Sequence, residues 1–190
     1  LTLPVGSNLY GVATDSILDA PTYMDIMRAS GLQFPAVERL QQPVMIASGS
    51  RDPVTQAQMA VLANRTSLID APDGIAPVSY SMNSPWVLSI SDGGAEISGQ
   101  EAAIRFAAST VRFVREKKPA ALLICGGESA DAILDLFGIA VLKVRAEITP
   151  GLPLCEIRTE YGRIQFVTKS GGFGTPTLLA ELLEEASRQI

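Results

Sequence analysis

Residues 120–130 read AALLICGGESA, and this stretch contains a strand, a turn and the start of a helix. Ala120–Cys125 is apolar at every position, which is typical of a strand in a sheet that is covered on both faces. Gly126-Gly127 then turns the chain. A helix is predicted from about Ser129 to Phe137, and Gly138 is expected to end it. A strand of this kind, followed directly by a helix, predicts an α/β protein.

The same alternation of strand and helix precedes this stretch. Three short apolar runs are predicted to be strands, namely Val44–Ala47, Ser67–Ile69 and Val87–Ile90. Asp52 is the expected N-cap of a helix over Val54–Ala63, with Pro53 at the first helical position. Ser98–Glu101 forms a capping box, in which each side chain can accept a hydrogen bond from the other residue's amide. The long helix that begins there is predicted to end at Lys117-Lys118-Pro119.

After residue 138 the pattern predicts further strands and one last helix. Ile139–Val144 is the next expected strand, and Leu154–Arg158 and Ile164–Lys169 are expected to pair as a hairpin. The last helix is predicted to have Thr175 as its N-cap and Pro176 as its first residue.

The segment before residue 43 is less regular, although Asp15–Ser30 and Phe34–Leu40 have the pattern of helices. We therefore expect residues 1–42 to be a connecting segment that is partly helical, and residues 43–190 to be the main domain. The predicted fold class is α/β, with a mixed, largely parallel sheet sandwiched between helices in three layers.

The composition excludes several classes of function. With 47% hydrophobic and 18% charged residues, the 190-residue chain suits one globular domain, or one and a fraction. A net charge of -5 without a basic stripe argues against a nucleic-acid partner. We also expect no membrane partner, because the sequence has no apolar run near the ~20 residues that a bilayer span needs.

The residue types available for chemistry are restricted as well, because the sequence contains no histidine. Ser-His-Asp and Cys-His chemistry and His-ligated zinc are thereby excluded. Phosphoryl transfer fits this restriction, because its catalysis consists mostly of positioning and charge neutralisation. Cys125 and Cys155 are expected to be reduced core thiols in a cytoplasmic protein. The chain begins at Leu1 without a signal-peptide pattern, so we expect the native amino terminus to lie upstream.

Three predicted strand-to-helix junctions contain small residues, and these are Ser48–Pro53, Gly126–Ser129 and Lys169–Pro176. In open α/β sheets, ligands bind beyond the carboxyl ends of the strands, and glycine amides at a helix N-terminus suit a phosphate group. Each junction could also be a purely structural turn. Lys169–Gly174 has three glycines in four residues, which exceeds the need of a turn and favours contact with a phosphate or ribose. The Walker A and dinucleotide-binding patterns are absent.

Two carboxylates leave alternatives open. Asp92, between a predicted strand and Gly93-Gly94, either holds Mg²⁺ through water or forms a turn. Glu147 precedes a proline-stiffened turn and is either part of a pocket wall or a solvated side chain. Trp86 and Tyr80 are expected to be core or edge aromatics.

The order of motifs resembles that of a known family. Gly126–Ala130, Glu147–Pro153 and Lys169–Gly174, with Ser48–Ser50 before them, resemble the C-terminal domain of the four-carbon acid sugar kinases, some of which are also labelled Hrp-dependent type III effector outer proteins. The resemblance extends from about Pro43 to the end of the chain. The sequence departs from the family pattern at Arg51-Asp52, where small residues are frequent, and at Gly172, where asparagine is common.

The resemblance implies a two-domain kinase that uses ATP with Mg²⁺. Its N-terminal domain, absent here, would bind an acid such as threonate, erythronate or 3-oxo-tetronate, and residues 43–190 would bind the nucleotide. The implied nucleotide contacts are Ser50, Asp52, Gly126, Gly127, Glu128, Ser129, Gly151, Gly171, Gly172, Phe173 and Gly174. No metal-ligating side chain or catalytic residue is implied within this chain.

Two other classes of function stay open at this point. The domain could bind a nucleotide or another phosphate ligand without turnover, or it could be an interaction protein whose glycine turns are structural. Any of these is compatible with a homo-oligomer.

Overall fold

The computed structural model describes residues 38–78, 80–81 and 83–188. The helices expected over Asp15–Ser30 and Phe34–Leu40 lie wholly or mostly outside these ranges. Within the described residues, the elements in chain order are β1 (Val44–Ser48), α3 (Pro53–Ala63), β2 (Leu68–Pro72), β3 (Trp86–Ser91), α4 (Gly99–Lys117), β4 (Ala121–Cys125), α5 (Gly127–Phe137), β5 (Lys143–Thr149), β6 (Leu152–Thr159), β7 (Gly162–Lys169) and α6 (Leu178–Ser187).

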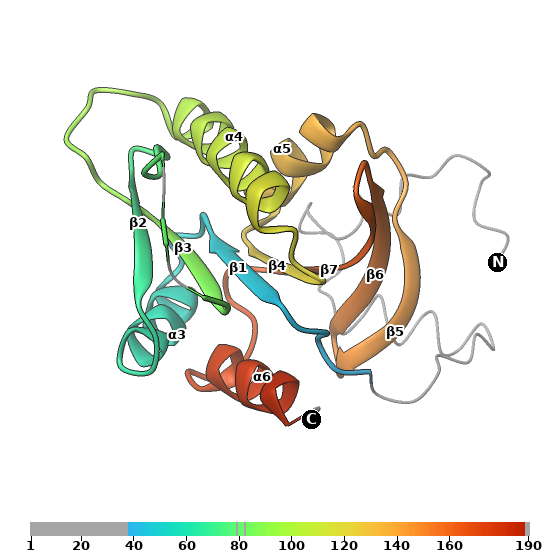
Figure 1. The fold of residues 1–190 in the computed structure, drawn as a ribbon. Coiled ribbons are helices and arrows are strands. Elements are labelled where there is room, and N and C mark those ends of the chain that lie inside the picture. The colour runs from blue at the N-terminus through green and yellow to red at the C-terminus, as the bar shows by residue number, and fades with distance from the viewer. Residues whose placement is uncertain (1–37, 79, 82, 189–190) are drawn as a thin grey trace, which may run out of the picture.

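The strands form one mixed sheet in the order β2-β3-β1-β4-β7-β6-β5 (Figure 1). Neighbouring strands from β2 to β7 in this order are parallel, whereas β6 is antiparallel to both β7 and β5. The predicted mixed, largely parallel sheet is therefore confirmed. The hairpin expected near the carboxyl end is also confirmed, and its two strands are longer than predicted.

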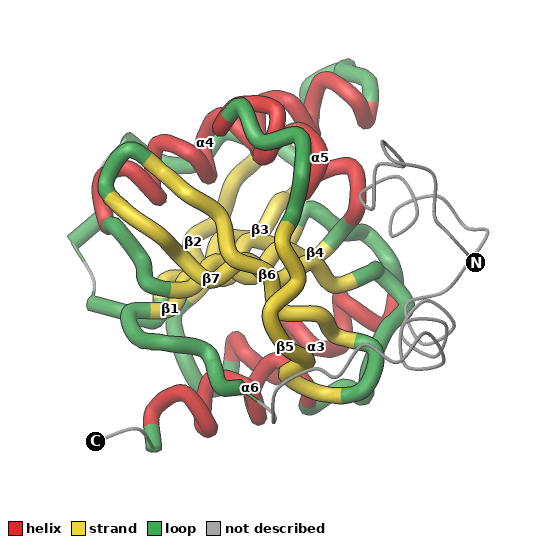
Figure 2. Tube along the Cα trace, turned by 90° about the vertical axis from the view of Figure 1, so that its right-hand side faces the viewer, coloured by secondary structure: helices red, strands yellow, loops and turns green. Residues whose placement is uncertain are grey.

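Helices cover both faces of the sheet, as the three-layer prediction requires. Figure 2 shows α4 and α5 on one side of the strands and α3 and α6 on the other. The first face buries Phe106 and Phe113 of α4 with Ile133 of α5, and the second buries Leu62 of α3 with Leu179 of α6. Because both faces are covered, β1 and β4 are buried at every position.

The ends of the helices follow the sequence signals closely. Asp52 Oδ1 accepts a hydrogen bond from the Val54 amide at 2.8 Å and caps α3. Ser98 caps α4 through the Glu101 amide, whereas the Glu101 carboxylate pairs with Arg105 one turn further along. Only the serine half of the expected capping box is therefore seen in α4.

The two predicted aromatic positions lie in the core. Trp86 begins β3 and is 8% exposed, and Tyr80 packs against the same hydrophobic cluster from the preceding loop. Among the described residues, no helix combines the length and the apolar composition that a membrane span requires.

Two predicted boundaries are wrong. The strand expected over Ile139–Val144 is β5, which begins four residues later, because the Ile139 amide still donates to Leu134 O at the end of α5. The last helix begins at Leu178 with Thr177 as its N-cap, so Thr175 is not the N-cap and Pro176 lies in a turn before the helix. The Leu178 amide donates to Thr175 O, which closes that turn.

Candidate functional site

The carboxyl ends of three strands meet at one edge of the sheet. The parallel register places Ser48 of β1 beside Cys125 of β4, and Cys125 beside Lys169 of β7. From this edge the chain continues from β4 into α5 on one face, but from β1 into α3 and from β7 into α6 on the other face. Loops that leave in opposite directions open a crevice on each side of β4, and such crevices are where open α/β sheets bind ligands.

A pocket of about 330 Å³ lies in this crevice. This volume falls within the range of small-molecule sites. The lining is mostly small residues, and it consists of Gly49, Ser50, Arg51, Ile90, Gly99, Ala102, Ala103, Gly126, Gly127, Glu128, Ser129 and Gly171.

The backbone at the N-terminus of α5 forms one wall of the pocket. Gly126 is the N-cap with φ of 108°, a conformation that favours glycine. Gly127, Glu128 and Ser129 form the first turn, where amide hydrogens lack partners within the helix and the helix dipole is positive. A Cβ on Gly49 would lie 1.9 Å from Ser129 Oγ, so only glycine lets the loop after β1 approach α5 this closely.

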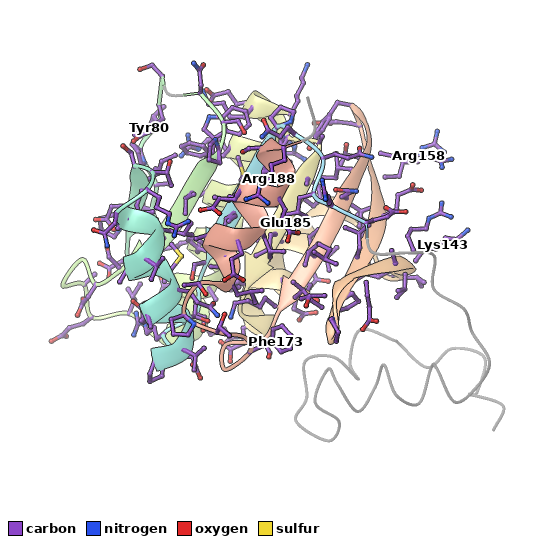
Figure 3. The ribbon with its side chains drawn as sticks, turned by 90° about the horizontal axis from the view of Figure 1, so that it is seen from below. Tyr80, Lys143, Arg158, Phe173, Glu185 and Arg188 are labelled. Carbon is purple, nitrogen blue, oxygen red and sulfur yellow. The ribbon has the colours of Figure 1, made fainter. Side chains whose placement is uncertain are left out.

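Gly171, in the loop between β7 and α6, also lines the pocket. A Cβ on Gly171 would lie 2.7 Å from the Asp52 Cβ and 2.8 Å from Ser50 Oγ. Gly171 must therefore be glycine for this loop to pack against the loop after β1. The remainder of the loop continues toward Phe173, which Figure 3 shows near one edge of the molecule.

Side chains from α3 hold the carbonyl groups of this loop. Thr55 Oγ1 donates to Gly171 O at 2.6 Å. Gln58 Nε2 donates to Phe173 O at 2.9 Å and to Thr175 O at 2.8 Å. Both side chains are fully buried, so α3 holds the loop from the interior of the protein.

Lys169 lies under the same loop with its side chain only 1% exposed. Its Nζ donates to Thr55 Oγ1 and Ser170 O at 2.9 Å each, to Phe173 O at 3.2 Å and to Gly171 O at 3.3 Å. Burial lowers the pKa of Lys169 below its ordinary value, while the charge of Asp52 acts in the opposite direction.

The two cysteines are free and buried, as expected for core thiols. Burial raises the pKa of the Cys125 thiol to about 12, although the charge of Lys169 lowers it in part. Burial likewise raises the pKa of Cys155 to about 12. Both thiols are therefore protonated and unreactive at neutral pH.

The structure brings most of the predicted site residues together. Ser50 and the four residues 126–129 line the pocket, and Ser50 Oγ accepts from the Asp52 amide at 3.2 Å. Asp52 caps α3 outside the pocket lining and lies beside Gly171 and Gly172. In the glycine-rich loop, Gly171 lines the pocket, while Gly172, Phe173 and Gly174 continue beyond it.

Gly151 lies at the same sheet edge but not in the pocket lining. It occupies the turn between β5 and β6, which are the second and the first strand beyond β7 in the sheet. Glu147 is a half-buried strand residue whose Oε1 accepts from the Gly151 amide at 2.9 Å, so its carboxylate holds the turn between β5 and β6. Asp92 forms a turn, in which its Oδ1 accepts from the Gly94 amide. Among the described residues, no group of three or more acidic or thiol side chains could hold a metal ion alone.

Several residues that line the pocket are not predicted from the sequence motifs. Gly99, Ala102 and Ala103 bring the first turn of α4 against the pocket, and their small size at a capped helix start was a usable signal. Arg51 lines the pocket from within a motif that was recognised. The burial of Lys169 had no local signal, because its partner Thr55 is 114 residues away.

Comparison with known proteins gives consistent matches. The model of a family described as nucleotide-binding C-terminal domain matches residues 45–179. A 3-oxo-tetronate kinase of Pectobacterium atrosepticum is 30% identical over 115 residues, and a D-threonate kinase of Salmonella typhimurium is 24% identical over 86 residues. These matches cover 60% and 45% of this chain, but only 26% and 20% of the two relatives.

Solved structures show the same fold. A Bordetella bronchiseptica domain of unknown function, crystallised with citrate as a domain-swapped dimer, superposes with a TM-score of 0.64 at 20% identity, over 80% of this chain and 42% of that one. A Haemophilus influenzae protein gives a TM-score of 0.64 at 14% identity, over 87% and 46%. Because the family model spans well over half of the sequence, the chain belongs to the nucleotide-binding C-terminal domain family, whose named relatives are four-carbon acid sugar kinases.

Proposed function

We propose that this chain is the ATP-binding domain of a kinase that phosphorylates four-carbon sugar acids of the threonate, erythronate or 3-oxo-tetronate type. The observation that carries the proposal is the glycine-lined pocket between the loops after β1, β4 and β7. The names of the two curated relatives support the kinase class and the four-carbon acids. We also propose a cytoplasmic location, again because of the similarity to these two kinases.

The pocket suits the phosphate chain of a nucleotide. The first-turn amides of α5 and the positive end of its dipole favour an anion. A Cβ on Gly49 would meet the Ser129 side chain, and a Cβ on Gly126 would lie 3.3 Å from the Ser50 amide nitrogen. Arg51 adds a cation to the lining, where a guanidinium can bind phosphate oxygens in a bidentate manner.

The glycine-rich loop presents further donors. The carbonyl groups of Ser170, Gly171 and Phe173 all accept hydrogen bonds from the buried side. In a trans peptide, the N–H group points opposite to the carbonyl group of the same peptide unit. The amides of Gly171, Gly172 and Gly174 therefore point away from Lys169, and in our proposal they face the phosphate chain.

Mg²⁺ fits this donor set as a companion of the nucleotide. The ion is usually held by one or two carboxylates together with phosphate oxygens and water, and it neutralises phosphate charge during transfer. Glu128 in the pocket lining and Asp52 beside Gly171 are the carboxylates that we assign to this role.

The proposal is tested by titrating the protein with ATP and ADP, with and without Mg²⁺, in calorimetry and thermal-shift assays. At a ligand concentration one hundred times the dissociation constant, the folded state should gain about 2.7 kcal/mol. Arg51→Gln should weaken ATP binding about fivefold, which is roughly 1 kcal/mol. The control Arg158→Gln makes the same charge change on an exposed strand position and should bind like wild type. Absence of binding and of a thermal shift at millimolar nucleotide would contradict the proposal.

A further inference from the structure

The surroundings of Lys169 Nζ are unusual for a buried ammonium group. Its four hydrogen-bond partners are the Thr55 hydroxyl and the carbonyl groups of Ser170, Gly171 and Phe173, all of which are neutral oxygens. Among the described residues, no carboxylate lies within ion-pair distance of this group. Burying a charge without a counter-ion costs several kcal/mol. The oxygens around Nζ must therefore replace most of its hydration.

A cluster of backbone carbonyls and a hydroxyl is also the kind of site that holds a monovalent cation, since carbonyl oxygens can replace the hydration shell of K⁺. We propose that Lys169 is a positioning residue whose ammonium group acts as a tethered monovalent cation and fixes the glycine-rich loop, residues 170–174. The role of the loop in binding phosphate rests on the proposed function. The role of Lys169 in fixing the loop rests only on the contacts above.

The consequence for the loop follows from the peptide geometry. Three carbonyl groups converge on one point, and without a cation there they would repel one another. Thr55 and Gln58 would still donate to the Gly171 and Phe173 carbonyl groups, but the peptide units could rotate further about these single hydrogen bonds. The amides of Gly171, Gly172 and Gly174 would then lose part of their common direction. The charge of Lys169 thus acts at a distance from the ligand, through the backbone, rather than by touching it.

Two substitutions separate this role from simple packing. Lys169→Met fills nearly the same volume without a charge, and it leaves no room for an ion. Lys169→Ala removes the ammonium group and opens a space lined by the same carbonyl groups, which NH₄⁺ or K⁺ from solution can enter. Choline is too large to enter and serves as the salt control. Lys117→Ala is the matched control, because Lys117 Nζ donates to Tyr80 O far from the loop.

The first readout is the rate of chymotrypsin cleavage after Phe173, which is half-buried in the loop. In choline chloride, Lys169→Ala should be cleaved there at least tenfold faster than wild type, and NH₄Cl or KCl should restore most of the protection. Lys169→Met should be cleaved faster in every salt, and Lys117→Ala should match wild type. Cleavage after Phe137 provides an internal reference within the same chain.

The second readout is the dissociation constant of ATP in the same salts. Lys169→Ala should bind at least tenfold more weakly in choline chloride and recover in NH₄Cl, whereas Lys169→Met should not recover. If wild type binds no ATP, the proposed function fails, and the cleavage rates still test Lys169. If Lys169→Ala does not fold, Lys169→Met is the test. A cleavage rate after Phe173 equal to that of wild type would then overturn the inference. Equal cleavage rates of Lys169→Ala in choline, K⁺ and NH₄⁺ would also overturn it.

Discussion

Gly172 and Gly174 are two residues apart, yet the fold needs them for different reasons. Gly174 has φ of 90°, and a Cβ there would lie 2.3 Å from Leu178 Cδ2. Gly172 does not have a positive φ, and its Cβ would meet only Asp52 Oδ2 at an ordinary 3.7 Å. The folded chain therefore requires glycine at position 174, whereas at position 172 it has room for a side chain.

We expect Gly172→Val to weaken ATP binding tenfold or more, which is roughly 1.4 kcal/mol, because the side chain fills space above the loop amides. The melting temperature without nucleotide should change little. Gly174→Ala should lower that temperature, since a left-handed backbone alone costs about 1–2 kcal/mol. Calorimetry and thermal melts on both variants measure the two effects. Equal ATP affinity of wild type and Gly172→Val would remove this loop from the site.

The two loop residues also show what a sequence can and cannot reveal. Three glycines in four residues predicted a special loop, but not which glycine serves the backbone and which leaves space. Lys169 belonged to the recognised motif, and nothing near it in the sequence indicated that its ammonium group is buried. Its contact with Thr55 depends on how α3 packs under β7, and such packing is a property of the tertiary structure.

At the scale of elements, local signals located most strands and helices. The caps at Asp52 and Ser98 and the stop at Gly138 were correct, because each depends on a few neighbouring residues. The start of β5 was misplaced because Ile139 belongs to the apolar run but completes the end of α5. Glu147 was not predicted to lie in a strand, because a polar residue near a proline turn is typical of a loop. Its carboxylate is instead satisfied within the structure by the Gly151 amide of the next turn.

Asp52 has two assigned roles that substitution can separate. Asp52→Ala removes the α3 cap and should lower the free energy of unfolding by about 1 kcal/mol. Asp52→Asn keeps a capping oxygen and should preserve stability, but it removes the negative charge assigned to Mg²⁺. We therefore expect Asp52→Asn to reduce the gain in ATP affinity that Mg²⁺ provides. Urea unfolding and ATP titrations at two Mg²⁺ concentrations test this, and an unchanged Mg²⁺ effect would exclude the metal role of Asp52.

At the scale of the whole molecule, the aligned region spans 26% and 20% of the two named kinases. Phosphoryl transfer needs the acceptor hydroxyl in line with the terminal phosphate, and such orientation can supply ~7–11 kcal/mol of the barrier. In our proposal, that orientation comes from a separate acid-binding domain. The 190-residue chain alone should therefore not phosphorylate threonate or erythronate.

A coupled assay for ADP formation measures this expectation. Addition of a matching acid-binding domain should produce turnover, while the same mixture with Gly172→Val should remain slow at low ATP. Robust phosphorylation by this chain alone would show that the acceptor site has been misplaced.

The routing of the chain around β4 has a mechanical consequence. The helices after β1 and β7 belong to one hydrophobic core, and the helix after β4 belongs to the other. A molecule bound in the crevice touches loops from both, so it would add a further link between two layers that otherwise meet through the sheet and at the close approach of Gly49 to α5. Thermal fluctuations of either layer would then have to break contacts with the same ligand. A ligand in this one small pocket would in this way reduce the thermal fluctuations of both helical layers, including helices that the ligand does not touch.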